Sequence, residues 1–114
     1  MFARMFTIEG RRERLDDFAR TGEKKVMPAL KRLDGFVGLL FLANPRNGKL
    51  MIVTFWQSQE AMHGGEEASH WFRVFGAEVA GGEVTSVERY EVAFWETEST
   101  ALVGALGRGS LGGR

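Results

Sequence analysis

The two histidines of this chain are the side chains best suited to acid–base chemistry. His63 and His70 are its only histidines, and an imidazole titrates near neutral pH. Each is therefore a candidate catalytic general base, able to take a proton from a phenol or quinol. Seven residues apart on a continuous helix, they would share a face but lie two turns apart, too far to bind one metal ion together. We predict no metal site, and the alternative for each histidine is a solvated position on a helix.

Arg4 is a candidate substrate-binding residue. It shares one face of a predicted strand with Phe2 and Phe6, where a charged side chain needs a partner. The guanidinium either pairs with a carboxylate of the last strand, Glu88 or Glu91, or turns into a pocket to hold an anion.

Trp71 and Tyr90 are further candidates for contact with a ligand. Trp71 is adjacent to Phe72, and since adjacent helical residues cannot both point inward at the same angle, one of them is expected to line a pocket. Tyr90, the only tyrosine, either donates its hydroxyl to a ligand or lies at the edge of the sheet. The chain has no nucleophile elbow, phosphate loop or dinucleotide fingerprint, and no cysteine for thiolate chemistry.

A small α+β domain is expected to position these residues. Pro28 is predicted to kink the first helix near residues 24–27, because it lacks an amide hydrogen and clashes one turn back. Ser58 is a candidate N-cap for the second helix, whose expected buried stripe contains Ala68, Trp71, Phe72, Phe75 and Val79. Hydrophobic periodicity predicts strands over residues 2–8, 36–43, 50–56 and 84–95, and helices over residues 11–33 and 61–80, the latter weakened at Gly64-Gly65.

The order β-α-β-β-α-β is that of the ferredoxin-like fold, a four-stranded antiparallel sheet with both helices on one face. The two middle strands are apolar on both of their faces, whereas a strand wetted on one face alternates apolar and polar residues. Two helices cover only one face of a small sheet. We therefore expect a second copy of the chain to cover the other face, giving a homodimer.

Composition argues against two classes of partner, nucleic acids and membranes. The 114 residues carry fifteen basic and fifteen acidic side chains, which argues against a nucleic-acid partner. No apolar run is long enough to span a bilayer, and residues 1–4 do not begin a signal peptide, so we expect a cytoplasmic protein without a membrane partner. Residues 1–95 form the expected domain. The Gly-rich residues 96–114 are expected to be a flexible tail or to dock on a partner subunit.

Three short motifs resemble those of the antibiotic biosynthesis monooxygenase (ABM) domain, within the dimeric α+β barrel superfamily. They are Pro28-Ala29-Leu30, Gly35-Phe36-Val37-Gly38 and Trp56-Gln57-Ser58-Gln59-Glu60-Ala61. The resemblance covers residues 1–95 and implies a homodimer whose two sheets pack face to face. It also implies that Trp56 either stacks on a planar substrate or anchors the junction between strand and helix.

The chain departs from that family in two respects. A histidine that many members carry about nine residues after this tryptophan is replaced by Gly65, with His63 and His70 on either side. The haem-degrading branch needs an asparagine on the first strand and a tryptophan and histidine about ten residues apart on the second helix. This chain offers Thr7 and no asparagine on the first strand, and Gly81 stands ten residues after Trp71.

The function expected from the residues and the resemblance is a cofactor-independent monooxygenase acting on a small aromatic, quinol-like or phenol-like substrate. Trp56 and Trp71 would hold the ring, and His70 or His63 would remove the proton. Two alternatives remain open: a non-catalytic binding or structural dimer, and an isomerase or lyase on the same scaffold. Fold alone does not decide among them.

Overall fold

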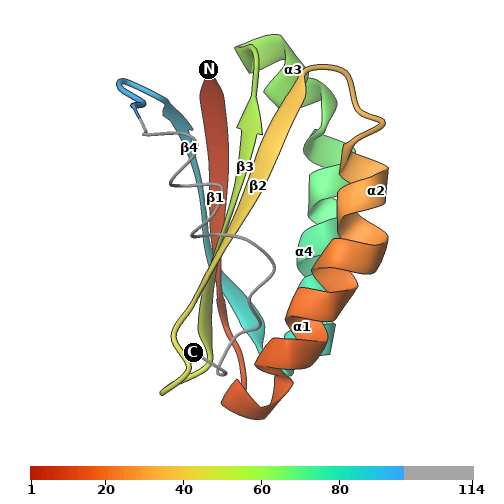
Figure 1. Cartoon of the computed structure of the whole chain (residues 1–114), viewed down its shortest axis with the longest axis vertical. Helices are drawn as coiled ribbons and strands as arrows, with labels where there is room; N and C mark the ends of the chain where they lie inside the picture. Colours follow the sequence, from red (N-terminus) through yellow and green to blue (C-terminus); the bar gives the residue numbers. More distant parts are fainter. Residues whose placement is uncertain (97–114) are drawn as a thin grey trace.

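One antiparallel sheet with all the helices on one of its faces makes up the domain (Figure 1). The structure is a computed structural model, and it describes residues 1–96. The strands follow the order β2-β3-β1-β4 across the sheet, so the first strand lies between the third and the fourth. The strands are β1 (Phe2–Glu9), β2 (Phe36–Ala43), β3 (Lys49–Trp56) and β4 (Glu83–Glu91). This is the predicted ferredoxin-like α+β fold.

The first helical segment is continuous but changes its winding along its length. Its parts are η1 (Arg12–Arg14), α1 (Leu15–Thr21), η2 (Gly22–Val26) and α2 (Met27–Leu30). The wide π-helical part η2 directly precedes Pro28 and overlaps the predicted kink. Since proline cannot donate to a carbonyl one turn back and its ring crowds that carbonyl, a wider turn accommodates it.

The second helical segment begins and breaks where its sequence indicates. Ser58 caps α3 (Gln59–Gly64) by accepting a hydrogen bond from the Ala61 amide at 3.0 Å. The helix then breaks at Gly65 and continues as α4 (Glu66–Ala80). An added Cβ at Gly65 would lie 2.5 Å from the Trp56 ring, so only glycine lets this indole fit under the helix.

The buried face of α4 differs from the predicted stripe. The residues turned fully inward are Ser69, Gly76 and Ala80, whereas Trp71 is 64% exposed and Phe75 is 39% exposed. Gly76 is turned inward, where an added Cβ would stand 3.1 Å from the Phe18 ring of α1 and 3.6 Å from the Ile8 side chain of β1. The helix is therefore rotated relative to the expectation, and Trp71 points away from the core.

Two clusters of apolar side chains fill the space between helices and sheet. One is centred on Phe6, Ile8 and Phe18, with Leu15, Leu50, Ile52 and Ala80 around them. The other contains Leu30, Trp56 and Met62. The first cluster uses alternate residues of β1 and β3, and Trp56 in the second lies on the same face of β3, as expected for strands with one face toward the helices.

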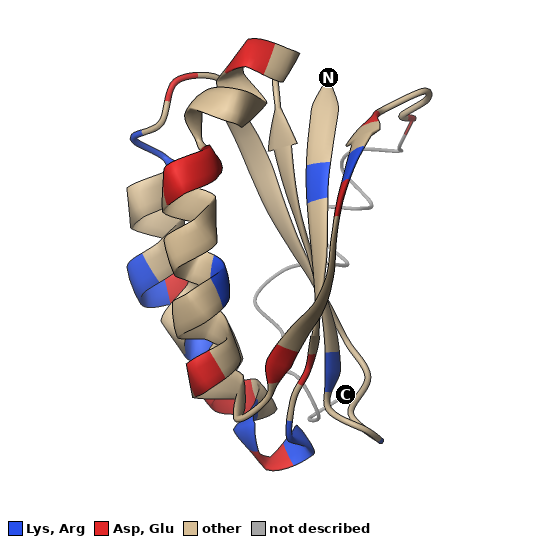
Figure 2. Cartoon of the chain, turned by 180° about the vertical axis from the view of Figure 1, so that it is seen from behind, with Lys and Arg blue, Asp and Glu red and all other residues tan. Residues whose placement is uncertain are grey.

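The opposite face of the sheet carries no helix, as Figures 1 and 2 show from two sides. Alternation along the strands places Leu42, Met51 and Val53 there, and Leu42 is half exposed. This confirms that the helices leave one face of the two-faced hairpin uncovered within the described residues. The covering of this face by a second copy stays a prediction.

β4 ends at Glu91, four residues earlier than predicted. Glu91 pairs with Phe2, the first residue of β1, so β1 has no further residues with which β4 could pair. Beyond that pair, the Val92 amide donates one hydrogen bond to the Met1 carbonyl. The chain then leaves the sheet, and the Trp95 ring packs edge-on against Phe55, 5.4 Å between ring centres. The tail predicted for 96–114 lies outside the described residues except for Glu96.

No helix among the described residues combines the length and the apolar character that crossing a membrane requires.

Candidate functional site

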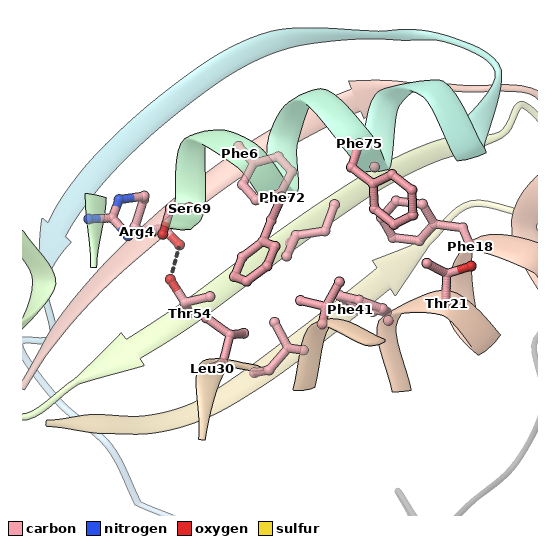
Figure 3. A pocket seen from close by; sticks show the side chains of 15 residues that line it. Arg4, Phe6, Phe18, Thr21, Leu30, Phe41, Thr54, Ser69, Phe72 and Phe75 are labelled. Carbon is pink, nitrogen blue, oxygen red and sulfur yellow. Dashed lines mark hydrogen bonds between the residues drawn. The ribbon is translucent and has the colours of Figure 1, made fainter. Parts of the chain in front are cut away.

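A mainly apolar pocket lies between the sheet and the helices. In Figure 3 the rings of Phe18, Phe72 and Phe75 stand along most of it, while Arg4 and Ser69 lie together at one end. Its walls come from β1, β2, β3, α1, η2, α2 and α4. The free space inside is about 30 Å³, room for one or two water molecules. The pocket is therefore nearly closed, with a polar end and an aromatic body.

Arg4 supplies the charge at the polar end of the pocket. Arg4 belongs to β1, which lies between β3 and β4 in the sheet, and the residue is only 1% exposed. The guanidinium donates from Nη1 to Ser69 Oγ and from Nη2 to the Met62 carbonyl. The Trp56 ring lies beside it, 5.7 Å from guanidinium carbon to ring centre. Helix α4 and the end of α3 therefore fix a buried cation.

The carboxylate that pairs with Arg4 comes from α4. Glu66 Oε2 lies 2.8 Å from Arg4 Nη2. The predicted partners on β4, Glu88 and Glu91, are not the ones used, because the residue directly across the sheet from Arg4 is another arginine, Arg89. That arginine also reaches Glu66, at 2.8 Å.

Three guanidinium groups share this one carboxylate, since Arg73 Nη2 lies 3.2 Å from Glu66 Oε1. Burial by itself raises the pKa of Glu66. Hydrogen bonds from Arg89 and Arg73 and the charge of Arg4 outweigh burial and lower the pKa to about 2. Glu66 is therefore ionised at neutral pH. Burial also lowers the pKa of Arg4, against the attraction of Glu66.

The two histidines lie outside the pocket. His63 is on α3 and His70 on α4, both are exposed, and neither is among the residues that line the cavity. The break at Gly65 also separates them onto two helices. Their positions give no support to the predicted role of general base.

The other predicted ligand contacts divide between core and surface. Trp56 is fully buried, and its indole nitrogen donates to Thr54 Oγ1 at 3.0 Å. It anchors the junction of strand and helix, one of the two expected roles. Trp71 lies on the outer side of α4, in a shallow surface hollow, and its neighbour Phe72 lines the pocket. Tyr90 is exposed on the outer strand β4, where a hydrogen bond to Glu88 raises the pKa of its hydroxyl.

Sequence reasoning named Arg4 as a candidate but none of the polar residues that surround it in the structure. Glu66, Ser69 and Arg73 all lie on α4. Glu66 and Ser69 contact Arg4 from far along the chain, and Arg73 contacts Glu66 from the same helix. The one available signal was the spacing of Glu66, Ser69 and Arg73 along one side of a helix. That spacing is also common on solvated helices, so it was not informative by itself.

No family model matches the chain. A relative is the uncharacterised protein Rv2557 of Mycobacterium tuberculosis, 32% identical over 108 residues that make up 95% of this chain and 48% of that protein. The chain thus spans about half the length of the curated relatives it matches.

Solved structures share the architecture at lower identity. The haem degrader MhuD of Mycobacterium tuberculosis has a TM-score of 0.66 and 18% identity, covering 85% of this chain and 100% of that one. The monooxygenase from the gene ActVA-Orf6 of Streptomyces coelicolor, in complex with nanaomycin D, has a TM-score of 0.62 and 14% identity, covering 84% and 92%. Other matches are named for antibiotic biosynthesis monooxygenases. This chain has the fold of that class of protein, as the sequence motifs indicated.

Proposed function

We propose that this chain is an ABM-type monooxygenase that oxidises a small planar aromatic substrate, quinol-like or phenol-like, inside the pocket between sheet and helices. One observation carries the proposal: an aromatic cavity with a buried cation at one end. Once its aromatic wall moves to make room, such a cavity suits a planar ring that bears one polar oxygen. The shared fold with structures named as monooxygenases adds support from analogy.

The reaction class needs no added reductant if the substrate itself supplies the electrons. For anthrone, dioxygen reacts at the activated CH₂ carbon. One oxygen atom becomes the new carbonyl, and the other leaves as water with the two hydrogens of that carbon. The protein's task is to bind the ring, favour its electron-rich anion and keep bulk water away.

Oxygen consumption with anthrone or a quinol tests this proposal. The matched variants are Val26→Trp, which adds an indole to the pocket wall, and Val74→Trp, which adds one on the outer side of α4. We expect uptake above the buffer background, a fall of about tenfold in Val26→Trp and little change in Val74→Trp. Uptake by the unmodified protein that equals the background contradicts the proposal.

A non-catalytic binding or structural dimer is the second candidate, and the small free volume of about 30 Å³ favours it. A pocket that stays closed would simply be part of the core. This candidate predicts that anthrone neither binds nor is oxidised, and that Val26→Trp alters only the stability of the protein.

The proposal includes a homodimer formed through the helix-free face of the sheet. Leu40, Leu42, Met51 and Val53 present apolar surface there, and burial of such surface is the main driving force for association.

A further inference from the structure

The charge balance around Arg4 leaves a place for one more anion. Arg4, Arg73 and Arg89 together face a single carboxylate, Glu66, which leaves two positive charges in excess among the described residues. A buried charge is costly unless it is paired. The charge of an exposed arginine is solvated by water and screened by salt. Arg4 is almost fully buried and Arg73 is only 11% exposed, so neither gains much from solvent.

Two hydrogen-bond donors in this cluster also lack partners. Arg4 Nε and Arg73 Nη1 are buried, and neither has a hydrogen-bond acceptor among the described residues. Most buried polar atoms in folded proteins are satisfied, so an unsatisfied donor on a charged side chain needs an explanation. For Arg4 Nε, whose side chain lines the pocket, a ligand oxygen that is present only in the complex would supply the missing acceptor.

Among the described residues, Arg4 is also the only ionisable side chain that lines the pocket. The remaining lining residues are apolar except for Thr21, Thr54 and Ser69. No carboxylate and no imidazole of the described residues is among the side chains that line the pocket. Charge stabilisation, rather than a protein base, is what this cavity can offer to a hydroxyl group.

We propose that the pocket binds its aromatic ligand as an anion, with the ionised hydroxyl oxygen held against the Arg4 guanidinium at the end of the pocket formed with Ser69. The hydroxyl proton goes to bulk water, and the excess positive charge of the arginine cluster takes the place of a general base. The ligand class is an acidic phenol or enol whose ring lies among Phe18, Phe72 and Phe75. This inference rests on the proposed function in taking this pocket as the ligand site.

Entry of a ring requires the aromatic wall to move. Phe75 lies at the rim, since it borders both the interior pocket and the surface hollow that contains Trp71 and Val74. Gly22 and Val26, on the opposite wall, belong to the π-helical part η2. Such wide turns often occur at functional sites. Rotation of Phe75 outward would open the pocket on this side.

A coloured phenol tests the inference directly. The probe is 4-nitrophenol, whose phenolate absorbs visible light and whose phenol does not, and the neutral control is 4-nitroanisole, its methyl ether. We expect bound 4-nitrophenol to stay ionised about one pH unit below its midpoint in buffer, which corresponds to about tenfold tighter binding of the anion than of the neutral form. The ether should bind at least about tenfold more weakly than the phenolate.

Three arginine variants locate the effect. Arg4→Gln should abolish the shift in the probe's midpoint, and Arg46→Gln, an exposed arginine of the β2–β3 loop, should leave it unchanged. Arg89→Gln removes one charge of the cluster without altering the pocket lining, and should reduce the shift. Circular dichroism shows whether each variant folds. If Arg4→Gln does not fold, the reduced shift in Arg89→Gln still tests the inference.

The outcomes separate this inference from the monooxygenase proposal. Equal binding of phenol and ether overturns the anion site, as does an unchanged shift in both Arg4→Gln and Arg89→Gln, while oxygen uptake would still support an oxygenase. Selective phenolate binding without oxygen uptake supports the anion site and contradicts the oxygenase. Failure of 4-nitrophenol to bind at millimolar concentration overturns the inference.

Discussion

Glu66 has the clearest energetic role of any single residue in the domain. It faces three arginines, and its pKa of about 2 lies below the usual value of 4.5. A carboxyl whose pKa is lower in the folded state stabilises the fold above its unfolded pKa, and that contribution is lost as the pH falls toward the folded pKa. The contribution of Glu66 is therefore complete at neutral pH and disappears between about pH 4.5 and pH 2.

Glu66→Gln should reduce the free energy of unfolding by about 1–2 kcal/mol at pH 7, after allowance for solvent screening of a side chain that is 36% exposed. Urea denaturation at several pH values measures this. The difference from the unmodified protein should shrink as the pH approaches 2. Glu67→Gln, on the same turn but exposed, is the control and should have little effect. A difference that does not depend on pH would contradict the ionised cluster.

The histidines give a second prediction at the residue scale. His63→Ala and His70→Ala, singly and together, should leave oxygen uptake within about twofold of the unmodified protein, since both side chains are exposed and neither lines the pocket. The dependence of uptake on pH should also be unchanged. A large loss of uptake in either variant, with the fold retained, would restore the histidine as the base.

At the scale of elements, the break between α3 and α4 is set by one side chain from β3. Trp56 fills the space under Gly65, where an added Cβ would come within 2.5 Å of the ring. The adjacent Gly64 has nothing within 4 Å of such a Cβ. Packing against Trp56 therefore requires glycine at position 65, whereas no contact requires it at position 64.

Gly65→Ala should destabilise the domain by about 1–3 kcal/mol, the usual cost of overpacking a filled core. Gly64→Ala should be neutral or stabilising by up to about 1 kcal/mol, because alanine is the better helix former. Thermal or urea unfolding of both variants measures the contrast. Equal effects of the two substitutions would mean that the Trp56 ring does not set the break.

At the scale of the whole molecule, we expect the helix-free face of the sheet to govern assembly. Its apolar residues come from the two-faced hairpin, and Trp95 covers only the part next to Phe55. A face of this kind, left in water, favours association.

We expect a dimer at micromolar concentration in size-exclusion chromatography with light scattering. Val53→Asp, on the helix-free face, should give a folded monomer, because a buried unpaired charge opposes association. Val74→Asp, on the exposed side of α4, is the matched control and should remain dimeric. A monomeric unmodified protein would contradict the prediction.

Local patterns in the sequence were sufficient for the elements. The Ser58 cap, the helix irregularity before Pro28 (predicted as a kink) and the uncovered second face of the hairpin all depend on residues close together in the chain. The end of β4 was not predicted, because its length depends on where β1 begins.

The site depended on the tertiary structure. Arg4 meets Glu66 and Ser69 only when β1 and α4 pack together, and the inward face of α4 is chosen by the space that Phe18 and Arg4 leave. The sequence by itself determined which segments are strands and helices and that one sheet face would stay apolar. Only packing between distant segments decided which polar side chains share the pocket, since those contacts have no local pattern.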